Sequence, residues 1–260
     1  MIVLDCESRE SALESVSAIY GIPTNLLDKF LLDFDMDAHY DAYYANNAPP
    51  RYCDQELRLV FESEFGSTPA PIDRVFWFHL TRARLGSDFA NGIQPLSVAL
   101  DHVWQTVVEV FRTTVHEGRL MEMRRNGVPS DLYQMKVKKS TLGGPYAMLV
   151  RAVATCPREI GNHDYLRLPE IMGDICNGYQ DIYGESLHDV LTQALTPIIV
   201  KFWSTEKLSV SCIESAMYYL YLTAHNRRLD SNANTCFDGK NKAIPSEQIV
   251  RVDVTGAYLL

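Results

Sequence analysis

The segment Arg74–Leu80, RVFWFHL, constrains the fold more than any other part of the sequence. It is rich in aromatic and β-branched residues, which is typical of a buried strand. Residues 1–66 are mostly helical in pattern, so several helices precede this first predicted strand. That order favours an α+β fold over a doubly wound sheet, in which strands and helices alternate regularly.

Capping residues and apolar periodicity predict the other elements. The predicted helices cover 8–21, 24–34, 55–65, 97–118, 169–183, 187–195 and a segment that opens at Ser209 or Ser211. The further predicted strands cover 146–154, 197–203 and 248–254. The tyrosine-rich segment 37–50, which ends in two prolines, is expected to be a loop.

The segment STPAPID interrupts the pattern just before the first predicted strand. We therefore expect a helical N-terminal region over residues 1–70 and an α+β domain over residues 71–260. The chain has 260 residues, of which 47% are apolar, so it can bury a sizeable core. Its 22% of charged residues makes wholesale disorder improbable.

The formal net charge of −9 argues against non-specific binding along nucleic acid, although it leaves room for a local basic rim. We expect the densest basic segment to be a solvent-exposed face; its residues are Arg124, Arg125, Lys136, Lys138 and Lys139.

Six widely spaced cysteines, at positions 6, 53, 156, 176, 212 and 236, form no CxxC pair. No signal or transit peptide pattern opens the sequence, and no run of eighteen apolar residues occurs. We therefore expect a cytoplasmic protein with buried, reduced thiols, no membrane segment and no metal.

Several common chemistries lack their motifs. The sequence has no GxxxxGK[ST] phosphate loop, no GxGxxG fingerprint, no HExxH helix and no GxSxG elbow. The commonest nucleotide, zinc and hydrolase sites are thereby excluded, but a site assembled from distant strands is not.

The most informative stretch is FWFHLTRARLGSDFANGIQPL, from Phe76 to Leu96. A predicted strand ends in His79 and is followed by Thr81, and Gly92-Ile93 comes after a short segment. This block resembles the first block of the ADP-ribosyltransferase superfamily, which includes poly-ADP-ribose polymerases and nucleic-acid-modifying toxins of the DarT kind. The resemblance covers about twenty residues. It implies an ADP-ribosyltransferase-like split mixed sheet with inserted helices.

The resemblance also implies roles for individual residues. NAD would be a substrate, held by His79, Thr81 and Gly92, and Arg82 is predicted to contribute. Tyr146 best matches the aromatic residue that stacks on nicotinamide in the family. Arg151 could bind the pyrophosphate or pair with an acid.

The family also uses a glutamate that holds a ribose hydroxyl and activates the acceptor. No glutamate precedes Pro245 at the usual place, so Glu247 is the preferred candidate, with Asp238 and Glu206 as alternatives. If no acid fits, the chain would be a non-catalytic relative.

Three functional hypotheses follow. The first is an NAD-dependent ADP-ribosyltransferase, a bacterial toxin or phage-defence effector that modifies nucleic acid or protein and is neutralised by an antitoxin. The second is a non-catalytic interaction module of a defence or toxin-antitoxin system that uses the aromatic segment 40–52 and the helical N-terminus, because tyrosine is favoured at interfaces. The third is a metal-independent nuclease that uses His79 with Arg82 or Arg84.

Overall fold

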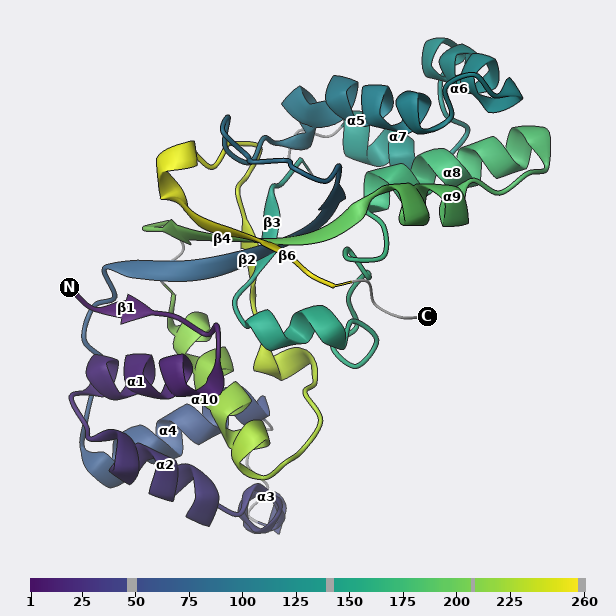
Figure 1. Ribbon diagram of the computed structural model, residues 1–260. Coiled ribbons are helices and arrows are strands. Elements are labelled where there is room, and N and C mark those ends of the chain that lie inside the picture. Colours follow the sequence, from purple (N-terminus) through teal and green to yellow (C-terminus); the bar gives the residue numbers. More distant parts are fainter. Residues whose placement is uncertain (46–50, 139–142, 207–208, 257–260) are drawn as a thin grey trace. The chain divides into compact units, whose positions relative to one another are not determined.

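The computed structural model describes residues 1–45, 51–138, 143–206 and 209–256 (Figure 1). Within those ranges the fold is of mixed α and β type, which agrees with the α+β class predicted from the sequence. The α-helices are α1 (Arg9–Tyr20), α2 (Thr24–Asp33), α3 (Met36–Ala45), α4 (Cys53–Phe65), α5 (Leu96–Val110), α6 (Val115–Asn126), α7 (Asp131–Lys138), α8 (Glu170–Tyr183), α9 (His188–Ala194) and α10 (Val210–Ala224). The short 3-10 helices are η2 (Arg151–Thr155), η3 (Ser231–Ala233) and η4 (Ser246–Gln248).

The strands form one sheet. They are β1 (Val3–Leu4), β2 (Arg74–Ala83), β3 (Tyr146–Met148), β4 (Thr196–Ser204), β5 (Cys236–Asp238) and β6 (Ile249–Val254). The order is β5-β3-β2-β4-β6, and β1 pairs in parallel with β2. The β2–β3 and β4–β6 pairs are antiparallel, with Phe78 opposite Met148 and Val200 opposite Val252. The predicted strands around 74–80, 197–203 and 248–254 are therefore confirmed as β2, β4 and β6.

The chain divides by packing into two compact units, each made of three sequence segments. Unit 1 comprises residues 1–78, 148–162 and 203–237, and unit 2 comprises residues 79–147, 163–202 and 238–260. The boundary predicted near residue 70 stays a prediction, because these units follow packing rather than chain order.

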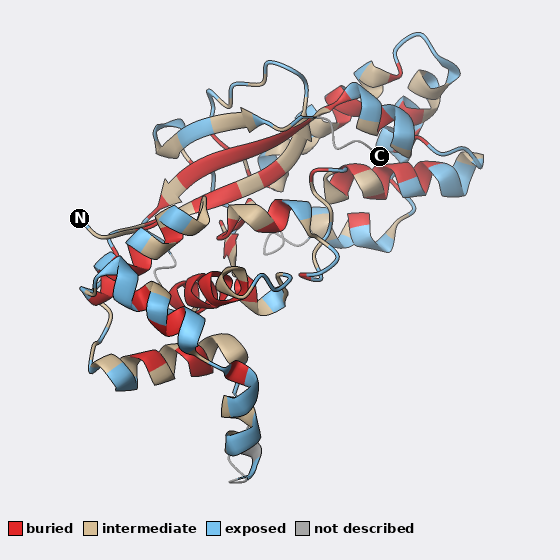
Figure 2. Ribbon diagram, turned by 60° about the horizontal axis from the view of Figure 1, so that its bottom comes forward, coloured by how far each residue is buried: buried red, intermediate tan, exposed pale blue. Residues whose placement is uncertain are grey.

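The core of unit 1 is built around α10. All of its residues from Cys212 to Leu222 are buried, as Figure 2 shows. A helix that is buried on every side needs apolar neighbours all round, and α1, α2 and α4 supply them. Phe61 of α4 packs edge-on against Tyr20 of α1, with ring centroids 4.9 Å apart.

Helix α1 begins and ends where the sequence predicts. Ser8 caps it in a capping box with Ser11, and Gly21 ends it in the left-handed conformation at φ 65°. Gly66 ends α4 in the same way, at φ 58°. These local signals act within one turn of the chain, which is why they are legible without tertiary information.

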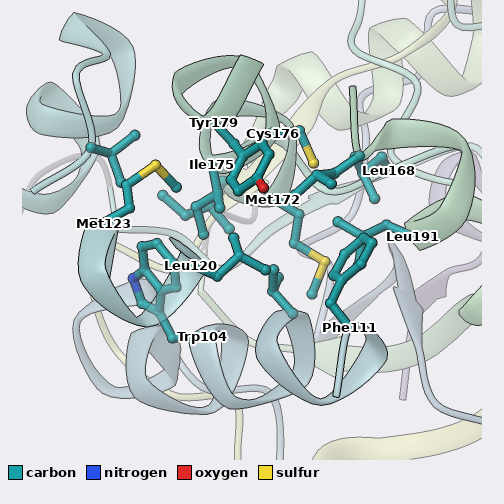
Figure 3. Close-up of a cluster of buried hydrophobic side chains, with 14 of the residues drawn as sticks. Trp104, Phe111, Leu120, Met123, Leu168, Met172, Ile175, Cys176, Tyr179 and Leu191 are labelled. Carbon is teal, nitrogen blue, oxygen red and sulfur yellow. The ribbon is translucent and has the colours of Figure 1, made fainter. Parts of the chain in front are cut away.

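Unit 2 holds a second core, formed by α5, α6, α7, α8 and α9 (Figure 3). Trp104 of α5, Leu120 of α6 and Tyr179 of α8 are all almost fully buried in it. The Trp104 indole N–H donates to the Tyr133 hydroxyl of α7 at 3.0 Å, so the polar atoms of both rings are satisfied inside the cluster. Helices α5 to α9, which lie between β2 and β4 in the chain, thus form a packed body of their own.

The expected loop over 37–50 is wrong for the residues that the structure describes. Residues 36–45 form α3, whereas 46–50 lie outside the described residues. The Asp35 carboxylate starts the helix by accepting from the backbone N–H groups of Asp37 and Ala38, at 3.1 and 3.0 Å. The loop was predicted from the tyrosine-rich composition of the segment, and the capping role of Asp35 was missed.

The single helix expected over 97–118 is two helices. Helix α5 ends at Val110, Thr113 takes a positive φ of 65°, and Thr114 caps α6. Gly118 therefore lies inside α6 and does not end a helix. Ser97 is not the cap either, because Pro95 occupies that position.

The strand expected over 146–154 stops at Met148. The Asn234 side-chain oxygen accepts from the N–H groups of Leu149 and Val150, at 3.0 and 3.1 Å. The Leu149 N–H is shared with the Thr235 backbone oxygen at 3.0 Å, so a side chain competes with the backbone for these donors where the chain turns into η2. Apolar periodicity does not report such a competitor.

No helix in the described part of the chain is both long and apolar enough to cross a bilayer.

Charged groups are also packed inside unit 1. The Arg58 guanidinium binds Glu62 at 2.7 Å and Glu214 at 3.0 Å, and the Tyr20 hydroxyl donates to Glu62 at 2.9 Å. Nearby, one carboxylate oxygen of Asp54 is buried without a hydrogen-bond partner in the described residues. Burial, reinforced by the charges of Glu214 and Asp230, raises the pKa of Asp54.

We predict that Asp54→Asn stabilises the protein at pH 7. The pKa of Asp54 in the folded protein lies above its unfolded value of about 3.9. The wild type therefore loses stability as pH rises from the unfolded pKa through the folded pKa. At pH 7 the free energy of unfolding of the variant should be roughly 0.5–1 kcal/mol larger than that of the wild type, and this gain should vanish near pH 4. Thermal melts at both pH values measure this difference, with Asp33→Asn, at the exposed last residue of α2, as the control. A destabilised Asp54→Asn at pH 7 would contradict the account.

Candidate functional site

Strand β2 places His79 and Thr81 on the same side, because alternate residues of a strand share a face. Both side chains are half-buried near the end of the strand. The His79 Nδ1 lies 2.7 Å from the backbone oxygen of Tyr146 on the neighbouring strand β3. The His79 side chain thus contacts the backbone of Tyr146, another residue predicted for the site.

This hydrogen bond fixes the tautomer of His79. A carbonyl oxygen can only accept, so Nδ1 carries the proton and donates. Burial lowers the pKa of His79, and the bond to Tyr146 opposes that shift only in part. The imidazole is therefore neutral at pH 7, and Nε2 is a hydrogen-bond acceptor that has no partner among the described residues.

Tyr146 follows a tight backbone. Gly144 has a positive φ of 59°, and a Cβ there would lie 3.1 Å from the Tyr146 ring and 2.9 Å from its backbone nitrogen. The glycine therefore lets the ring lie against the main chain. Burial raises the pKa of Tyr146, and the carboxylates of Asp238 and Glu170 raise it further.

The turn that follows β5 holds Asp238 beside this backbone. The N–H of Gly239 donates to the Pro145 oxygen at 2.9 Å, and the N–H of Asn241 donates to the Gly144 oxygen at 2.8 Å. The Asp238 carboxylate is half-buried and accepts from the Lys240 N–H at 2.9 Å. Of the three acids proposed from the sequence, Asp238 is therefore the one placed next to Tyr146.

Glu170, the first residue of α8, is the neighbouring acid that sequence reasoning did not assign to the site. It accepts from the Tyr165 hydroxyl at 2.9 Å and pairs with Lys136 at 3.0 Å. Lys136 also binds the buried Asp174 at 2.8 Å. No sequence motif marks this network, since its members come from α7, α8 and the loop before α8.

Arg82 is engaged by the protein backbone. Its guanidinium donates to the carbonyl oxygens of Leu195, at 2.9 and 3.1 Å, and Leu166, at 2.8 Å. The side chain thereby ties two loops to β2. These bonds use most of its donors, so Arg82 acts here as a structural clamp.

Gly92 allows a close approach of two chain segments. Ile93 and Ile244 exchange two backbone hydrogen bonds of 2.9 Å, and Gly92 has a φ of 77°. A Cβ at Gly92 would collide with the carbonyl oxygen of Ile244. Only glycine satisfies both demands.

The other acids and Arg151 are placed differently. Glu247 belongs to η4, three residues after Ile244, and its side chain is exposed. Glu206 and Arg151 belong to unit 1; Glu206 is exposed, and the Arg151 N–H donates to the Cys6 oxygen at 3.1 Å. Within unit 2 the structure thus gathers His79, Tyr146 and Asp238.

Among the described residues, no group of three or more His, Cys, Asp or Glu side chains is arranged to hold a metal ion. Comparison of the chain with protein-family models, with curated proteins and with solved structures finds no match.

We predict that Gly92→Ala destabilises the protein by more than about 2 kcal/mol, because it adds a collision with Ile244 to left-handed strain. Gly86→Ala is the matched control. Gly86 has a similar φ of 89°, but a Cβ there would meet nothing within 4 Å. We expect the control to cost about 1 kcal/mol. Equal losses in denaturant unfolding would show that the Ile93–Ile244 bridge is not what requires glycine.

Proposed function

We propose that the chain is an NAD-dependent ADP-ribosyltransferase with an ADP-ribosyltransferase-like fold. The observation that carries this proposal is the hydrogen bond from His79 Nδ1 to the Tyr146 carbonyl. It leaves Nε2 as a fixed acceptor on β2, beside an aromatic residue of the next strand. A ribose hydroxyl is the kind of donor that such an acceptor binds.

The chemistry of the reaction fits these groups. Cleavage of the nicotinamide–ribose bond builds positive charge on the ribose, which a nearby carboxylate stabilises. Tyr146 would stack on the nicotinamide ring, His79 would accept from a ribose hydroxyl, and Thr81 would help to position the nucleotide. Nicotinamide leaves with the bonding electron pair, and a nucleophilic oxygen or nitrogen of the acceptor forms the new bond to the ribose.

We propose Asp238 as the carboxylate of this site in preference to Glu247. Asp238 is the last residue of β5, which neighbours β3 in the sheet, and the turn that follows it is bonded to Gly144 and Pro145. It would stabilise the ribose cation and take the proton that the acceptor loses. Aspartate is one methylene shorter than the family's glutamate, so the reach to the ribose is shorter.

The acceptor would be a macromolecule, either nucleic acid or protein, as for a bacterial toxin or phage-defence effector with an antitoxin. The net charge does not decide between them. Unit 1 contains 18 of the 33 acidic and 10 of the 24 basic residues, so most of the negative charge lies there. Unit 2, with the candidate site, has 15 acidic and 14 basic residues and is nearly neutral.

The alternative is a non-catalytic interaction module. The exposure of Glu247 and the shortness of Asp238 favour it, because both weaken the expected carboxylate. Such a protein would bind NAD without turning it over, or would not bind it.

We predict that His79→Ala weakens NAD binding at least tenfold in calorimetry. The variant loses the hydrogen bond that Nε2 would accept from a ribose hydroxyl, and it leaves that hydroxyl desolvated without a partner. His102→Ala, on the exposed side of α5, should bind like the wild type.

The affinity of the wild type for NAD should be constant above pH 6.5 and fall at lower pH, because the pKa of His79 is lowered and protonated Nε2 cannot accept a hydrogen bond. Absence of NAD binding by the wild type would refute the proposed function.

We predict that Asp238→Asn abolishes NAD turnover but leaves NAD binding within about threefold, because the carboxylate acts on charge that develops in the transition state. Glu247→Gln should turn NAD over at the wild-type rate. Released nicotinamide is the measured quantity. The opposite pattern, with loss only in Glu247→Gln, would assign the reaction to Glu247, and wild-type binding without turnover would support the interaction module.

A further inference from the structure

Helix α4 has two faces. Leu57 and Phe61 are fully buried in the core of unit 1. A second stripe at helical spacing lines a shallow groove on the outside; its residues are Glu56, Leu59, Val60, Ser63 and Glu64. Leu59 and Val60 are half-buried, whereas Ser63 and Glu64 are exposed. The groove thus has an apolar floor and an exposed acidic end at Glu64, whereas Glu56 at its other end is buried and binds His39 and Arg51.

The acidic end carries negative charge that the chain itself does not fully pair. The C-terminal turn of α4 carries Glu62 and Glu64 and no basic residue, although a helix C-terminus favours positive charge. Glu62 is compensated by Arg58 and by the Tyr20 hydroxyl. Glu64 is exposed and has no charged or hydrogen-bonding partner among the described residues, so it can pair with a basic group from another molecule.

Helix α7 presents the complementary surface. Tyr133 and Lys136 face inward, where Lys136 binds Glu170 and Asp174. On the outer side Leu132 is 55% exposed and Met135 is 38% exposed, and Lys138 follows at the next step of three. An exposed apolar pair that ends in a lysine matches a groove with an apolar floor and a terminal glutamate.

We propose that the α4 groove of one molecule binds the outer face of α7 of a second copy of this chain. Val60 and Leu59 would contact Leu132 and Met135, and Glu64 would pair with Lys138. The two surfaces differ, so the contact is head-to-tail, and each molecule of a pair keeps one of its two surfaces for a further neighbour. Two short helix faces bury little area, which places the association at the weak end of protein interfaces.

Sedimentation velocity of the full chain tests this directly. We expect the weight-average sedimentation coefficient to rise between about 10 µM and about 1 mM protein, and to rise less in high salt, which screens the Glu64–Lys138 pair. Val60→Asp and Met135→Asp should each remove the rise. Val190→Asp, at an exposed position of α9 outside both surfaces, should leave it unchanged.

The head-to-tail arrangement predicts complementation. Val60→Asp keeps the α7 face, and Met135→Asp keeps the groove, so a mixture of the two variants should form 1:1 dimers although neither associates alone. Because Val60 is half-buried, the exposed variants Glu64→Lys and Lys138→Glu provide a second test that does not strain the fold. Each should weaken association at least threefold, and the double variant should restore it.

A wild type that stays monomeric to about 1 mM would overturn self-association and leave the α4 groove to a partner of another sequence. Variants that associate like the wild type, or a mixture that does not form dimers, would also overturn the proposal. None of these outcomes depends on NAD binding.

Discussion

The hydrogen bond between the His79 side chain and the Tyr146 main chain is the contact on which the candidate site depends. It joins a side chain of β2 to the backbone of β3, so the position of the imidazole is set by the sheet itself. It also decides which nitrogen carries the proton. This bond therefore fixes the place and the hydrogen-bonding character of the group that would meet a ligand, whereas burial keeps that group neutral.

Two residues of the Phe76–Leu96 motif, Arg82 and Gly92, stabilise the fold. Arg82 clamps backbone carbonyls, and Gly92 lets Ile93 pair with Ile244. Both are needed to build the surroundings of His79, yet neither presents a free group to a ligand. A motif residue can thus be essential to a site through packing, without touching what the site binds.

The parts of the fold that could be predicted are those whose causes are local. Ser8 and Gly21 bound α1, and the aromatic run at Arg74–Leu80 forms β2. The strand prediction over 146–154 was wrong because distant groups decide: Asn234 and Thr235 bind the end of β3 from more than eighty residues away and leave no trace in its periodicity. The loop expected over 37–50 and the single helix expected over 97–118 were wrong because the local caps Asp35 and Thr114 were missed.

The same distinction applies to the site. His79 and Tyr146 could both be named from the sequence, because each matches a residue of the resembled family on a predicted strand. The acid could not, since its position depends on how the turn after β5 bonds to Gly144 and Pro145. Spacing relative to Pro245 favoured Glu247, whereas backbone bonding places Asp238 beside Tyr146.

The ring nitrogens of His79 provide the most direct test, because nitrogen NMR of histidine-labelled protein distinguishes a protonated from an unprotonated nitrogen. At neutral pH we expect Nδ1 to be protonated and Nε2 to be unprotonated, and we expect the Nε2 signal to move when NAD is added. A proton on Nε2, or signals that NAD leaves unchanged, would contradict the account.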